Sequence, residues 1–194
     1  MIVSHSNKFI YLKSYKTAST SVEMFFERFC KDSDIIGYRG PNPIPDNCDW
    51  WNHMKPLEIK TKLNNDEVWN QYFKFGCVRN PWERTLSSYL FRNKKTFYPE
   101  YNMSFEEYCM SNSFPTFRKF YNLEMDYYIR FEELHKGIEV VCNFLGLPCD
   151  LSQLPHEKKT NHRHYTEYYT DEMRDKIAEN HKEDIDFFNY TFGD

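Results

Sequence analysis

Residues 8–29 read KFIYLKSYKTASTSVEMFFERF, and three kinds of segment follow one another in this stretch without a gap. Phe9 to Leu12 is an apolar run of strand length. Residues 14–21 are small and rich in hydroxyl groups, with Lys16 in their middle. Apolar side chains then recur at the spacing i, i+3, i+4 and i+7 that marks one face of a helix, at Val22, Phe25, Phe26 and Phe29. The stretch therefore predicts a strand, a tight polar loop and a helix.

A loop that ends in a helix N-terminus is a natural anion site. The first backbone N–H groups of a helix lack partners within the helix, and the helix dipole places about half a positive charge there. Lys16 adds a full charge, and hydroxyl donors are available from Thr17, Ser19, Thr20 and Ser21. The loop is therefore predicted to hold a phosphate or sulfate group, whereas Glu23, on the helix that follows, is expected to be a helix-face charge.

The composition is that of a globular protein. The chain has 194 residues, which fits one domain spanning 1–194. Its net charge of −4 argues against a general nucleic-acid binder. The six cysteines show no close pairing, so free thiols are expected and a zinc site is not. No apolar run has membrane-spanning length and no signal peptide is evident, which predicts a soluble, cytoplasmic protein without a membrane partner.

The strand–turn–helix pattern occurs again further along the chain. Tyr72 to Val78 is a second strand, which ends at Arg79, and Pro81 suits the first turn of the helix that follows. Asp126 to Phe131 reads as a third strand, followed by a helix over Glu132 to Leu145. Alternating strands and helices indicate a parallel sheet with helices on both faces. Ligands of such sheets bind at the carboxyl ends of the strands, so both polar turns are expected to face one ligand.

The loop around Lys16 does not fit the commonest nucleotide-binding motifs. A Walker A loop needs Gly-x-x-x-x-Gly-Lys-Ser/Thr, and these glycines are missing. The second strand ends in Arg79 and offers no acidic ligand for magnesium. The chain also lacks Gly-x-Gly-x-x-Gly. A metal-assisted ATPase or kinase and a dinucleotide enzyme are therefore disfavoured.

Two segments together resemble the PAPS-dependent sulfotransferases. Lys16-Thr17-Ala18-Ser19-Thr20-Ser21 is similar to their 5′-phosphosulfate loop, and residues 79–89 (RNPWERTLSSY) are similar to their 3′-phosphate segment Arg-Asn-Pro-x-x-Arg-x-x-Ser-x-Tyr. Residues 129–134 (IRFEEL) and the closing residues 183–192 resemble the carbohydrate branch, which includes enzymes like heparan sulfate 2-O-sulfotransferase. The resemblance implies an α/β fold like that of P-loop NTPases, with PAPS as donor and PAP as product and without a metal.

The resemblance also implies roles for individual residues. Lys16 and the loop up to Ser21 would hold the 5′ end of PAPS, with Lys16 at the bond that breaks. Arg79 and Ser87 would hold the 3′-phosphate, and Arg84 is expected to be structural. Residues 156–160 (HEKKT) resemble the loop that closes over the cofactor, where Lys158 and Thr160 would contact the 3′-phosphate side, although a solvated basic loop is an equal alternative.

His53 is the first candidate for the base that takes the proton from the acceptor hydroxyl. It lies between the two phosphate segments, in the stretch where the resembled carbohydrate sulfotransferases carry such a histidine. Its alternative is an ordinary capping or core histidine, and His5, His156, His162 and His164 are weaker candidates. Two positions depart from the family pattern, because Tyr15 stands where a proline is frequent and Ser19 where glycine is frequent.

The acceptor is expected to be a hydroxyl group, on a carbohydrate according to the resemblance. Two other functions stay open at this point, a P-loop kinase that uses ATP and a non-catalytic protein that binds nucleotides or glycans on the same fold. The sequence gives no indication of the oligomeric state.

Overall fold

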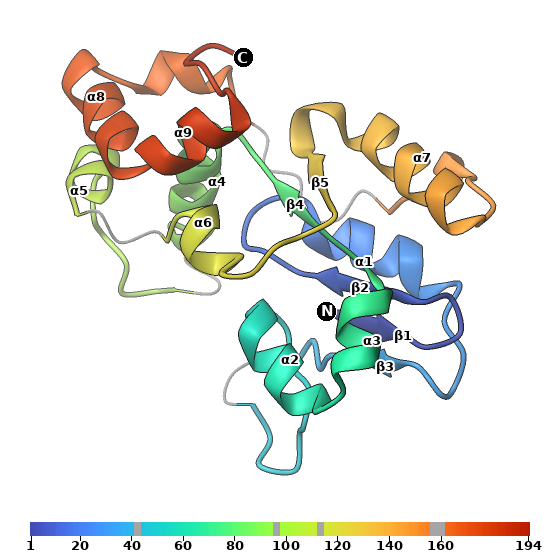
Figure 1. Ribbon diagram of the computed structural model, residues 1–194. Helices are drawn as coiled ribbons and strands as arrows, with labels where there is room; N and C mark the ends of the chain where they lie inside the picture. Colours follow the sequence, from blue (N-terminus) through green and yellow to red (C-terminus); the bar gives the residue numbers. More distant parts are fainter. Residues whose placement is uncertain (41–43, 95–97, 112–114, 156–161) are drawn as a thin grey trace. The chain divides into compact units, whose positions relative to one another are not determined.

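The computed structural model describes residues 1–40, 44–94, 98–111, 115–155 and 162–194 (Figure 1). The chain divides into two compact units. The first contains Met1–Val78 and Phe120–Glu157, and the second contains Arg79–Lys119 and Lys158–Asp194. Each unit is described by itself.

The first unit is built on a sheet of five strands in the order β3-β1-β2-β4-β5, in which β4 runs between β2 and β5 (Figure 1). The strands are β1 (Ile2–Ser4), β2 (Phe9–Leu12), β3 (Ile35–Ile36), β4 (Phe73–Val78) and β5 (Tyr127–Arg130). β2, β4 and β5 are parallel, which confirms the three strands predicted from their apolar runs. The helices of this unit are α1 (Ser19–Glu27), α2 (Pro56–Leu63), α3 (Asp66–Gln71) and α7 (Leu134–Leu145).

The prediction of a wholly parallel sheet is wrong at one edge. β1 pairs with β2 in antiparallel register, and β3 pairs with β1 in the same way. Only residues 5–8 connect β1 to β2, and Lys8 there adopts a left-handed φ of 54°. A connection this short can close a hairpin but cannot cross over to a parallel neighbour. The sheet is therefore mixed.

The core of the first unit lies between one face of the sheet and the helices α1 and α7. The inward strand residues alternate along β2 and β4 as the pleat requires, and they pack against the helix face predicted from the sequence. The fully buried members include Phe9, Tyr11, Phe25, Phe26, Phe75, Ile129 and Ile138. Phe9, Phe26 and Phe75 are in mutual ring contact, with centroids 4.9–5.9 Å apart. Aromatic rings thus supply the centre of this core.

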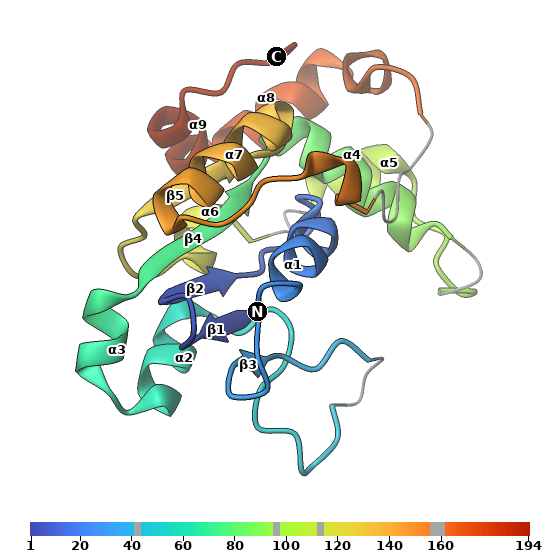
Figure 2. The same ribbon diagram turned by 90° about the vertical axis from the view of Figure 1, so that its right-hand side faces the viewer.

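The opposite face of the sheet is also covered. Lys74 and Gly76 point to this side, because they alternate with the core residue Phe75. The Lys74 ammonium reaches the backbone carbonyl of Trp69 in α3 at 3.2 Å. α3 and α2 pack together beside the sheet (Figure 2). A Cβ atom on Gly76 would lie 2.4 Å from the Tyr121 hydroxyl, so any larger residue at this position would clash with Tyr121.

The second unit is helical in its described part. It contains α4 (Pro81–Arg92), α5 (Phe105–Met110), α8 (Asp171–Asn180) and α9 (Lys182–Phe188), while α6 (Phe117–Phe120) spans the boundary between the units. Ser104 and Glu107 form a capping box at the start of α5. The apolar spacing from Met173 to Phe188 predicts one last helix that begins at Asp171. This prediction is wrong, because His181 leaves the helical conformation and separates α8 from α9.

Candidate functional site

The Lys16 loop connects β2 to α1 and has an unusual backbone. Lys16 and Ala18 adopt left-handed φ angles of 63° and 55°. Left-handed conformations are costly for residues other than glycine, so the surrounding structure must hold them in place. A backbone that alternates in hand turns successive N–H groups toward one point, which forms an anion-binding concavity. Ala18 is also the N-cap of α1, and its methyl group offers no hydrogen-bond acceptor to the first N–H groups of the helix.

Hydroxyl groups inside the loop hold this backbone. Ser14 Oγ donates to the Cys77 carbonyl at 2.6 Å, so Ser14 accepts the 2.9 Å hydrogen bond from Thr17 Oγ1. Ser19 Oγ donates to the Ser14 carbonyl at 2.6 Å. The hydroxyl protons of Thr17 and Ser19 are thus engaged within the protein, which gives these two side chains a supporting role rather than the donor role expected from the sequence. Thr20, another of the expected hydroxyl donors, is half-buried.

Two buried tyrosines support the loop through hydrogen bonds from their hydroxyl groups. Tyr11 donates its hydroxyl proton to the Ser19 carbonyl at 2.9 Å. Tyr121 donates to the Cys77 carbonyl at 2.8 Å, the same oxygen that Ser14 contacts. Burial raises the pKa of both Tyr11 and Tyr121 well above the ordinary value, so both remain donors. Hydrogen bonds to the sheet and to Tyr121 therefore hold the loop in place.

His53 lies against the start of this loop. Its Nδ1 is 2.9 Å from the carbonyl oxygen of Lys13, and its ring stacks on that of Tyr15 with centroids 3.8 Å apart and planes 15° apart. Lys13 and Tyr15 both precede Lys16 in the same loop. His53 itself has a left-handed φ of 63°. The structure thus brings His53 to the Lys16 loop, although His53 lies 37 positions after Lys16 in the sequence.

The contact with Lys13 determines the tautomer of His53. A carbonyl oxygen only accepts, so Nδ1 carries the proton and Nε2 keeps its lone pair. Burial lowers the pKa of His53 from 6.5 to about 4, and the hydrogen bond to the Lys13 carbonyl only partly offsets this. The imidazole is therefore neutral at physiological pH. A neutral ring with one oriented lone pair has the form that a general base requires.

The shifted pKa of His53 predicts how stability depends on pH. The unfolded chain takes up the proton near pH 6.5, whereas the folded chain takes it up only near pH 4. Between these values the unfolded state binds more protons, so this residue lowers stability as the pH falls from 6.5 to 4. Urea unfolding of the wild type and of His53→Asn across this range should show a weaker pH dependence in the variant. Equal slopes for the two proteins would contradict the shifted pKa.

The predicted 3′-phosphate residues belong to the second unit. Arg79 is buried, and its guanidinium donates to Glu83 at 2.8 Å. An anion bound by Arg79 would therefore share it with this carboxylate. Ser87 is buried on α4. Whether Arg79 and the Lys16 loop face one ligand remains a prediction.

Two other residues of the family-like segment make contacts within the second unit. The Asn80 side chain caps α4 by accepting from the N–H groups of Trp82 and Glu83, and it donates to the Thr191 carbonyl at 2.9 Å. The Arg84 guanidinium lies 3.9 Å from the centre of the Phe117 ring and is almost fully buried. This packing agrees with a structural role for Arg84, which stays a prediction.

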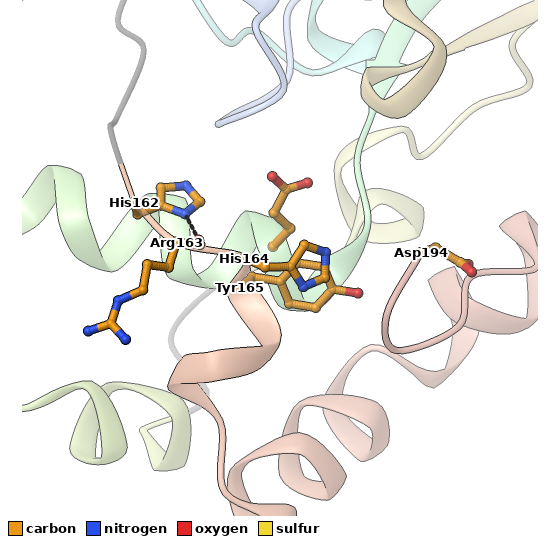
Figure 3. A pocket seen from close by; sticks show the side chains of 6 residues that line it. His162, Arg163, His164, Tyr165 and Asp194 are labelled. Carbon is orange, nitrogen blue, oxygen red and sulfur yellow. Dashed lines mark hydrogen bonds between the residues drawn. The ribbon is translucent and has the colours of Figure 1, made fainter.

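A polar pocket of about 380 Å³ lies in the second unit. Figure 3 shows His162, Arg163, His164, Tyr165 and Asp194, and Glu83 completes its lining. His162 and His164 were weaker candidates for the base, and their Nδ1 atoms contact the Arg163 carbonyl and the Thr166 hydroxyl. His164 is exposed, whereas His162 is half-buried like His53.

Lys158, Thr160 and His156 lie outside the described residues. In the rest of the chain no three His, Cys, Asp or Glu side chains are grouped in a way that could hold a metal ion. No helix in the described ranges is long and apolar enough to cross a lipid bilayer. The six cysteines are free thiols, as predicted from their spacing.

Sequence reasoning missed the charged residues behind His53. Glu23 was expected to be a helix-face charge, but it is fully buried and contacts Lys13 at 2.6 Å. A signal for this burial was available, because Glu23 precedes Phe26 by three positions and therefore borders the apolar face of α1. The buried Lys13 had no comparable signal.

Comparisons with known proteins agree with the resemblance to sulfotransferases at the level of the family. A family model described as "Sulfotransferase family" matches residues 1–139. An uncharacterized protein of Archaeoglobus fulgidus is 31% identical over 94 residues, which cover 44% of this chain and 77% of that relative. No solved structure matches the chain.

Proposed function

Because the chain belongs to the sulfotransferase family, and its activity is therefore sulfuryl transfer, we propose that it uses PAPS as donor and a carbohydrate hydroxyl as acceptor. The observation that carries the proposal is that Lys13 links an anion-binding loop to a neutral histidine of fixed orientation. The family-like segments at both ends of the predicted nucleotide site support PAPS. The likeness of residues 129–134 to the carbohydrate branch supports the acceptor.

In the proposed reaction an oxygen lone pair of the acceptor attacks the sulfur atom of PAPS in line with the bond to the leaving phosphate. The new S–O bond forms as the bridging bond breaks, and PAP leaves with the electron pair. Nε2 of His53 takes the proton of the acceptor hydroxyl. Lys16 and the backbone N–H groups of its loop stabilise the negative charge that develops on the leaving phosphate. Positioning and charge stabilisation supply most of the rate, as in phosphoryl transfer.

The remaining binding roles follow the family pattern. Lys16 and residues 17–21 hold the 5′ end of the donor, with Thr17 and Ser19 acting through the backbone that they support. Arg79, Ser87, Lys158 and Thr160 hold the 3′-phosphate side. We also propose that both units belong to one sulfotransferase domain and that the reaction needs no metal.

Calorimetry with PAP and with ATP tests the donor. We expect PAP to bind and ATP to bind much more weakly, because the loop lacks the Walker A glycines and the residue directly after β4 is Arg79, not an acidic magnesium ligand. Incubation with sulfur-labelled PAPS and a panel of glycans should then transfer label to a glycan. Binding of ATP without binding of PAP would contradict the choice of donor, and transfer only to non-carbohydrate hydroxyls would contradict the choice of acceptor.

A further inference from the structure

Glu23 is the centre of a buried group of charges beside the candidate site. Its Oε2 lies 2.6 Å from the Lys13 ammonium, and its Oε1 lies 2.5 Å from the Met1 amino group. Arg39 approaches the same carboxylate at 3.7 Å. Glu23 and Lys13 are 0% and 3% exposed. A carboxylate withdrawn from water to this degree is stable only with such partners.

Lys13 connects this group to the segment Asn52–His53 through its side-chain ammonium and through its backbone carbonyl. Its ammonium donates to Asn52 Oδ1 at 3.3 Å in addition to Glu23. Its carbonyl oxygen accepts the proton of His53 Nδ1 at 2.9 Å. Asn52 and His53 are consecutive residues, so one lysine contacts two neighbouring positions of the segment that carries the candidate base. Lys13 therefore contacts Asn52 through its side chain and His53 through its backbone.

We propose that Glu23 is a positioning residue, which acts through Lys13 to hold His53 in the tautomer with the proton on Nδ1. The effect of Glu23 on turnover rests on the proposed function, because this effect requires His53 to act as the base. The structural coupling between Glu23 and His53 does not depend on that role. A buried ion pair is in general weak evidence for stability. The location of this pair next to the residue that contacts His53 is better explained by orientation, which here passes through Lys13 and not through a direct carboxylate–histidine contact.

The test is nitrogen NMR of protein labelled at histidine, which reports the tautomer without requiring activity. In the wild type we expect His53 with Nδ1 protonated and Nε2 bare. In Glu23→Gln the Lys13 ammonium loses its charged partner, and we expect a mixture of tautomers. Turnover with PAPS should fall by roughly 10- to 100-fold, the range found when groups that orient metal-binding histidines are removed.

Glu27→Gln is the matched control. Glu27 lies one turn further along α1 and pairs with Arg39 at 2.7 Å, so the substitution removes an equal charge from the same helix. We expect His53 to keep its wild-type tautomer in this variant and turnover to stay unchanged. Mixed tautomers in Glu27→Gln as well would overturn the specific role of Glu23.

A second variant covers the case in which Glu23→Gln does not fold. Lys13→Met combined with Glu23→Gln removes both charges of the pair, so neither charge stays buried without the other, and we again expect mixed tautomers. A His53 that keeps the Nδ1 proton in either folded variant overturns the proposal. If tautomers mix but His53→Asn retains full turnover, the positioning of His53 stands and its role as base is wrong.

Discussion

His53→Asn is expected to lower turnover with PAPS by about 10²–10⁴-fold, the typical contribution of a positioned general base. The amide of asparagine has no lone pair of comparable basicity, so the proton of the acceptor hydroxyl has no acceptor in the protein. The affinity for PAP, measured by calorimetry, should stay unchanged, because His53 removes a proton and does not hold the nucleotide.

Asparagine is chosen because it preserves the structural contacts of His53. Its side-chain N–H group can replace Nδ1–H as the donor to the Lys13 carbonyl. Asparagine also tolerates the left-handed φ of 63° better than most residues. Loss of turnover in this variant can therefore be assigned to the missing base rather than to a displaced segment.

His5→Asn provides the matched control. His5 also forms a hydrogen bond through Nδ1, with the Tyr72 hydroxyl at 3.0 Å, but it lies in the hairpin between β1 and β2, away from the Lys16 loop. Turnover should be retained in His5→Asn. Retained turnover in His53→Asn would show that another group takes the proton.

Lys16→Met is expected to lower kcat by about 10²–10³-fold, the effect of removing one donor that stabilises developing charge. The bridging oxygen gains negative charge as the bond to sulfur breaks, so the ammonium contributes more in the transition state than in the bound ground state. Methionine retains an unbranched chain of similar length. Steady-state kinetics at varied PAPS concentration separate kcat from KM.

Lys8→Met is the control for backbone strain and for net charge. Lys8 has a left-handed φ of 54°, close to the 63° of Lys16, but it lies in the hairpin between β1 and β2. Its substitution should leave both kinetic constants unchanged. If Lys16→Met raises KM with kcat intact, Lys16 contributes uniform binding and the proposed stabilisation of the leaving group is wrong.

The elements that could be predicted from the sequence are those with strong apolar periodicity. The sequence predicts β2 with its correct ends, and the face of α1 that packs on the sheet follows the spacing of Val22, Phe25 and Phe26, with Phe29 just beyond the helix. The loop between them followed from its composition. These features are local, so the order of residues contains the information that determines them.

The missed features depend on contacts between distant residues. β1 and β3 have three and two residues, which is too short for a periodic signal. The inward-directed hydroxyls of Thr17 and Ser19 are explained only by the positions of Ser14 and Cys77. The tautomer of His53 likewise depends on the Lys13 carbonyl, 40 positions away in the sequence.

The left-handed Lys16 and Ala18 have a thermodynamic consequence for ligand binding. A glycine-rich loop is mobile and loses conformational entropy when a ligand orders it. In this loop Lys16 and Ala18 carry a Cβ atom, which restricts the backbone conformations available to them. The hydroxyls of Ser14, Tyr11 and Tyr121 hold the loop in place once the chain has folded. Preorganisation of this kind moves the ordering cost from the binding step to the folding step. An anion that enters the loop should therefore bind with a small entropic penalty.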